Sequence, residues 1–87
     1  MKVYLIEIRS NRDIDIKFER LQVFLTKEKA QEKMREIHDA LMKEFPNAKH
    51  SCVEDRAHLW YDTEGFNDGT LVYQIADVLI WEKFVNE

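Results

Sequence analysis

The sequence contains few of the residues from which disulfide frameworks, phosphate loops and membrane spans are built. Its one cysteine, Cys52, excludes an intramolecular disulfide and indicates a reducing cytoplasm. Its two glycines, Gly65 and Gly69, cannot form a phosphate-cradling loop, and no dinucleotide fingerprint is present. The apolar run at 78–81 is too short to span a bilayer, and the first residues do not form a signal peptide. We therefore expect a cytoplasmic protein without membrane contact and without a cofactor.

What is present is enough for one folded domain over residues 1–87. Hydrophobic residues make up 45% of the 87 positions and aromatic residues 11%, which is too much for a disordered chain. A chain of this length buries roughly 60–65% of the surface that its unfolded form exposes. One thin core is the most that it can build.

The N-terminal third predicts two strands. Residues 3–8 are apolar on one face and largely apolar on the other, and residues 14–18 alternate between apolar and charged side chains. The alternation resumes at 21–25 one residue out of phase, which predicts a β-bulge near Glu19 and Arg20.

A helix is predicted next, between Thr26 and Pro46. Thr26 is a suitable N-cap residue, and proline cannot continue a helix. The apolar residues between them recur every three or four positions, so they form one stripe on the helix: Ala30, Met34, Ile37, Leu41 and Phe45.

The second half is rich in strand formers. From Lys49 to Tyr61 the even positions, His50 to Trp60, are expected on one strand face and Leu59 and Tyr61 on the other, with a turn indicated at Asp55. Residues 67–69 predict a tight hairpin turn. Residues 76–85 fit either a strand or a short helix, and we favour the strand. The predicted fold is α+β: an antiparallel sheet of four to five strands with one helix across one face, in a ββαββ-like order.

Charge is divided unevenly along the chain. From His50 onward eight acids face two bases, Arg56 and Lys83, whereas bases slightly outnumber acids before it. We expect a negative field at one end of the fold, which favours a protein partner with a basic surface and disfavours direct nucleic-acid binding. Aromatic residues lie among these acids and are common in interface hot spots. The predicted partner-binding residues are Trp60, Tyr61, Asp62, Glu64, Phe66 and Asp68.

No catalytic or metal site is predicted. His50, Cys52 and His58 resemble zinc ligands, but the sequence lacks a convincing fourth ligand and a paired Cys-x-x-Cys. Residues two apart on a strand lie about 7 Å apart, too far for a direct Cys52–His50 pair. The acidic residues 62–68 do not have EF-hand spacing.

The segment 23–30, Val-Phe-Leu-Thr-Lys-Glu-Lys-Ala, follows an opening Lys-Val-Tyr-Leu-Ile at 2–6. Together they resemble a pattern found in small uncharacterised bacterial and phage proteins. The resemblance covers about the first half of the chain. It implies a strand–strand–helix opening and a domain that binds and blocks a host protein, such as a bacterial defence nuclease.

The leading hypothesis is therefore a non-enzymatic protein-binding module, in particular a phage-type inhibitor of a host nucleic-acid-handling protein. A structural or regulatory homodimer is the alternative, formed by pairing of exposed edge strands or through a partly apolar outer sheet face. A small enzyme with His58 or His50 as a base comes last.

Overall fold

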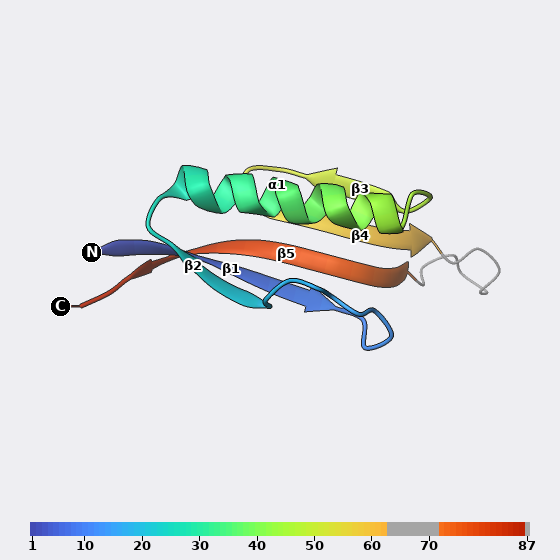
Figure 1. Ribbon diagram of the computed structural model, residues 1–87, viewed down its shortest axis with the longest axis horizontal. Coiled ribbons are helices and arrows are strands. Elements are labelled where there is room, and N and C mark those ends of the chain that lie inside the picture. Colours follow the sequence, from blue (N-terminus) through green and yellow to red (C-terminus); the bar gives the residue numbers. More distant parts are fainter. Residues whose placement is uncertain (63–71, 87) are drawn as a thin grey trace.

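The computed structural model describes residues 1–62 and 72–86, with only the backbone of Asp62 and Val72. It contains one helix and one five-stranded antiparallel sheet, the α+β fold predicted from the sequence (Figure 1). The elements follow in the order β1 (Lys2–Ser10), β2 (Leu21–Phe24), α1 (Lys27–Glu44), β3 (Lys49–Cys52), β4 (Arg56–Asp62) and β5 (Val72–Phe84).

The two longest strands occupy the middle of the sheet. The strand order is β2-β1-β5-β4-β3, and β1 pairs with β5 from Lys2–Phe84 to Ser10–Ala76. The two ends of the chain are therefore held together, with Val85 N donating to Met1 O at 2.8 Å. The short strands β2 and β3 form the edges. α1 carries the chain from one edge to the other across a single face of the sheet.

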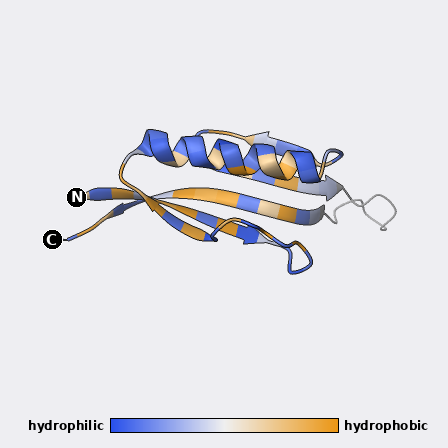
Figure 2. Ribbon diagram, in the orientation of Figure 1, coloured by the Kyte–Doolittle hydropathy of each residue, from blue (hydrophilic) through white to orange (hydrophobic). Residues whose placement is uncertain are grey.

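The core lies between α1 and the sheet. The predicted helix stripe is buried at Ala30, Met34, Ile37 and Leu41, and it packs on alternate residues of the inner strands, such as Ile6 and Val78. Figure 2 shows apolar colour on the side of α1 that faces the strands and polar colour on the side that faces away. Within residues 1–62 and 72–86, no helix covers the other face of the sheet.

The predicted helix ends are confirmed. Thr26 Oγ1 accepts a hydrogen bond from Lys29 N at 3.2 Å, and Thr26 itself is extended. This is the N-cap geometry, in which a side-chain oxygen satisfies an orphan backbone donor. At the other end Phe45 caps the helix directly before Pro46, and its N–H donates to Leu41 O at 2.8 Å.

The prediction of a strand at 14–18 is wrong. Residues 11–20 form an irregular segment in which Ile14, Ile16 and Phe18 pack against the core without joining the sheet. The β1–β2 ladder begins at Leu21 and has no register shift, so the bulge predicted at Glu19 and Arg20 is not there either. An extended chain alternates its side chains whether or not a neighbouring strand pairs with it, so the pattern alone could not separate the two cases.

The stretch from Lys49 to Tyr61, predicted as strand with a turn indicated at Asp55, is a hairpin, and its turn includes Asp55. β3 and β4 are joined by a turn that starts at Val53, whose N–H donates to Arg56 O at 2.8 Å. Residues 76–84 belong to β5, which confirms the favoured strand. The turn predicted at 67–69 lies outside the described residues.

Candidate functional site: the open face of the sheet

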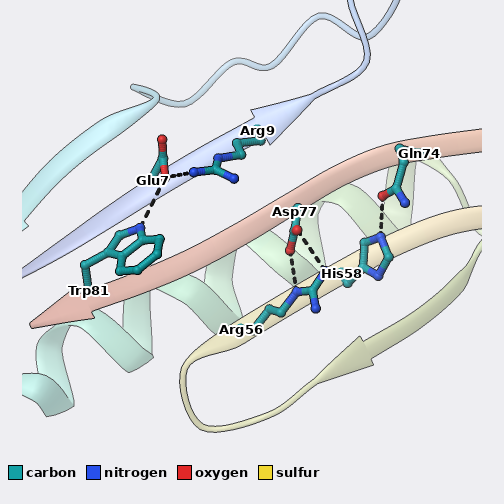
Figure 3. Close-up of polar contacts among 7 residues, drawn as sticks. All are labelled: Glu7, Arg9, Arg56, His58, Gln74, Asp77 and Trp81. Atoms are coloured by element: carbon teal, nitrogen blue, oxygen red, sulfur yellow. Dashed lines mark hydrogen bonds and ion pairs between the residues drawn. The ribbon is translucent and has the colours of Figure 1, made fainter.

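In the described chain, the face of the sheet opposite α1 is not covered by the helix (Figure 3). We call it the open face. Successive strand residues point to opposite sides, and directly paired residues point to the same side. The pairing register therefore defines the face, and Figure 3 views it with α1 behind the strands. Its members are Leu21, Val23, Val3, Leu5, Glu7, Arg9, Lys83, Trp81, Leu79, Asp77, Gln74, Arg56, His58, Trp60, Lys49 and Ser51.

An apolar patch covers one side of the open face. In the register, Val23 on β2, Leu5 on β1 and Trp81 on β5 are consecutive neighbours across three strands, and Leu21 and Leu79 flank Glu7 in the next row. We call these five apolar residues the apolar patch. Leu21 is 62% exposed, Val23 61% and Trp81 50%, while Leu5 and Leu79 are half-buried. Large apolar side chains gathered on one face, rather than scattered, are typical of an interaction surface.

The Trp81 ring is held in place from the neighbouring strand. Trp81 Nε1 donates a hydrogen bond of 3.1 Å to Oε1 of Glu7, and the same oxygen lies 3.0 Å from Arg9 Nη2 (Figure 3). The carboxylate thus fixes the indole and is itself neutralised by an arginine. A side chain that is already immobilised loses little conformational entropy when a partner covers it.

A second ion pair lies beside the patch. Arg56 on β4 donates from Nε and Nη2 to the two carboxylate oxygens of Asp77 on β5, at 2.7 and 2.8 Å (Figure 3). This bidentate hydrogen bonding and the carboxylate charge raise the pKa of Arg56. Asp77 also stands opposite Arg9 in the β1–β5 register. The two arginines of the open face are therefore neutralised within the molecule.

The polar side of the open face ends in an aromatic pair. His58 Nε2 donates a hydrogen bond to Gln74 Oε1 (Figure 3). The imidazole also stacks on the indole of Trp60, with ring centroids 4.8 Å apart and planes 27° apart. Trp60 is half-buried in this position.

The structure places only part of the predicted partner-binding set. Trp60 lies on the open face, whereas Tyr61 points to the helix side and packs near Tyr73, with ring centroids 6.5 Å apart. Asp62 is the last residue of β4, and its side chain lies outside the described residues, as do Glu64, Phe66 and Asp68. The two described aromatics therefore do not form one surface.

The expected single negative end is wrong for three of the described acids of the second half. Glu54 forms an ion pair with Lys27, Asp77 with Arg56 and Glu82 with Lys2. Two of the three bases come from the first half of the chain, because antiparallel pairing and the helix bring the two halves side by side. On the open face bases outnumber acids, with Lys49 and Lys83 at its margins.

The histidine and cysteine cluster predicted as a weak zinc candidate is divided between the two faces. His50 and Cys52 pair with the core residues Leu59 and Ala57 and so lie on the helix side, whereas His58 lies on the open face. The β3–β4 turn causes this split. Among residues 1–62 and 72–86, no three histidine, cysteine or acidic side chains gather as metal ligands.

A hydrogen-bonded chain that the sequence did not reveal lies under β3. His38 on α1 is buried, with its Nδ1 3.1 Å from Asp39 Oδ1 and its Nε2 3.1 Å from His50 Nδ1. His38 follows the helix stripe at four residues from Met34, which is the signal that could have found it. Nearby, Cys52 is exposed as a residue, but partial desolvation of its thiol raises the pKa of that group, so the cysteine is less reactive than a free one.

Two hollows among the described residues of the open face lie just below the usual size of a site for a drug-sized ligand. One of about 270 Å³ is lined by Arg9, Ser10, Asn11, Gln74 and Asp77, and another of about 230 Å³ lies beside Trp81 and Arg56. Sites for drug-sized ligands measure about 300–1,000 Å³. The face is better suited to a broad contact than to a small molecule.

Comparisons of the chain with protein-family models, curated proteins and solved structures give no match. Within the described residues, α1 is the one helix, and it is not apolar enough to cross a membrane. The chemistry of the open face therefore carries the functional argument.

Proposed function

We propose that this chain is a non-enzymatic protein-binding module and that it binds its partner through the open face. The observation that carries the proposal is Trp81, half exposed at the β5 side of the apolar patch and fixed by Glu7. Tryptophan is enriched among the residues that dominate binding energy, and immobilised anchors are favoured.

The surroundings of Trp81 support this role. The patch provides a mainly apolar surface, in which Glu7 is paired with Arg9, and the Arg56–Asp77 pair provides a polar rim whose charges are also paired. An interface of that composition, apolar in the core and polar at the rim, is usual for protein partners. We place the module in a reducing cytoplasm, which suits the exposed free thiol of Cys52.

The test is site-specific photo-crosslinking in the native host. A photoreactive amino acid replaces Val23 on the open face in one variant and Val53 in the β3–β4 turn in the other. Both positions are exposed to a similar degree, 61% and 58%. We expect protein adducts from position 23 that disappear when Trp81→Ala is added, and few from position 53. Position 23 giving no protein adduct, or adducts indifferent to Trp81→Ala, would overturn the proposal.

A narrower candidate is the phage-type inhibitor of a host nucleic-acid-handling protein. Its support is the composition of the sequence from the last residue of β4 to the start of β5, where Asp62, Glu64 and Asp68 accompany Phe66. Such a segment would favour a basic groove on the host protein. Capture of a basic host protein that weakens as salt rises and is lost on charge reversal of the three acids supports this candidate. Capture unaffected by charge reversal contradicts it.

A further inference from the structure

We propose that the partner of the open face is a second copy of this chain. The two copies pack sheet against sheet around a two-fold axis, with each α1 on the outside. This inference rests on the proposed function, since it names the occupant of the same surface. Two features of the face support it: its size and its self-complementary pattern.

The size of the face approaches what a stable dimer needs. The strands are 9, 4, 4, 7 and 13 residues long. At about 3.3 Å per residue and about 4.8 Å between strands, their combined face measures about 600 Å² of plane. A standard interface takes about 800 Å² of accessible surface from each partner. Side chains make the accessible surface of the face larger than its plane area. The face can therefore supply about 800 Å² only when a partner covers all of it.

A second copy covers it whole, because its own open face has the same outline. A single added strand or helix would cover a strip and leave much of the apolar patch in water. Two sheets with the usual twist stack about 10 Å apart, with their strands about 30° from alignment. Each helix then lies on an outer side of the dimer, where its polar face meets solvent (Figure 2).

The arrangement of apolar and charged residues on the open face allows it to pack against the same face of a second copy. A two-fold axis places the apolar patch of one copy on that of the other, so that apolar surface meets apolar surface. Arg9 and Arg56 bring no unpaired charge to the centre, because Glu7 and Asp77 already neutralise them. Lys83 near the chain end and Lys49 on an edge strand lie at the margin, where their charges stay in water.

The test measures the mass of the purified full chain by sedimentation velocity. The protein concentration runs from about 1 µM to several hundredfold higher, a range that covers micromolar dissociation constants. We expect the mass to rise from 10.5 kDa toward twice that value. Trp81→Ala and Val23→Asp should each weaken association by at least about tenfold, as substitutions at a hot spot do. Val53→Asp is the matched control and should leave it unchanged. Association should change little between low and high salt, because apolar contact carries it.

Folding is checked separately by far-UV circular dichroism and thermal melting. Val23 is exposed on an edge strand, so Val23→Asp remains informative even when Trp81→Ala unfolds the chain. A wild-type chain that stays monomeric at every concentration overturns the second-copy proposal alone. Crosslinks from position 23 to another protein would then still support the binding module. A dimer that survives both open-face substitutions uses another surface and also overturns the proposal.

Discussion

His38 on α1 and His50 on β3 form a hydrogen bond between their rings, with Nε2 of the first 3.1 Å from Nδ1 of the second. His38 Nδ1 lies 3.1 Å from a carboxylate oxygen of Asp39, which can only accept. His38 therefore donates from Nδ1 to Asp39 and, when neutral, accepts at Nε2 from His50 Nδ1–H. The chain fixes both tautomers and links the helix to an edge strand.

The first prediction concerns these tautomers. His38 and His50 should both carry their proton on Nδ1 when neutral, because the partner of each ring requires it. His58 should carry its proton on Nε2, where it donates to Gln74. Nitrogen chemical shifts of the imidazole rings distinguish the two forms, and His58 serves as the internal control. Nε2 protonation of neutral His38 would contradict the described geometry.

The predictability of the fold depended on whether a signal was local. Thr26 and Pro46 mark the helix ends through backbone chemistry that needs no distant partner, so both predicted helix ends were correct. The prediction of a strand at 14–18 failed, because side chains alternate in the same way on an extended chain that pairs with no neighbour. The turn after Cys52 contains no glycine or proline, so the sequence showed it only weakly at Asp55.

The candidate site was less predictable, because it depends on register. Asp77 meets Arg56, and Glu7 meets Trp81, only after β5 has aligned with β1 and β4. These pairings cannot be predicted from the order of the charged residues along the chain. The sequence did indicate a partly apolar outer sheet face, but it did not place Trp81 on that face beside Leu5 and Val23.

The second prediction concerns the core. Ile37 is fully buried between α1 and the sheet. Ile37→Ala should lower the free energy of unfolding by about 2–5 kcal/mol and Ile37→Val by about 0.5–1.5 kcal/mol, because each leaves unfilled volume. Urea denaturation measures both, and the valine variant keeps the test informative where alanine unfolds the chain. Val53→Ala at the exposed turn is the control and should change stability little.

The third prediction concerns Cys52. Because burial raises the pKa of its thiol, less thiolate is present at mildly alkaline pH than in an unfolded chain. Iodoacetamide should therefore alkylate native Cys52 more slowly than the same residue in urea. Mass spectrometry over time gives both rates. Native alkylation faster than that of the unfolded chain would indicate an activated thiol and would reopen nucleophilic chemistry at this position.

The last prediction concerns the ion pair between Lys27 at the start of α1 and Glu54 in the β3–β4 turn. The hydrogen bond and charge of Lys27 lower the pKa of Glu54 below its ordinary 4.5. A depressed pKa means that the stabilising contribution is present above about pH 4.5 and is lost as pH falls through the lower folded value. Glu54→Gln should therefore lower the melting temperature slightly at pH 7 and have no such effect near pH 2. In a Lys27→Gln background the same substitution should have little effect at either pH, because the partner charge is gone. If Glu54→Gln still lowers the melting temperature at pH 7 in the Lys27→Gln background, Glu54 acts through another contact.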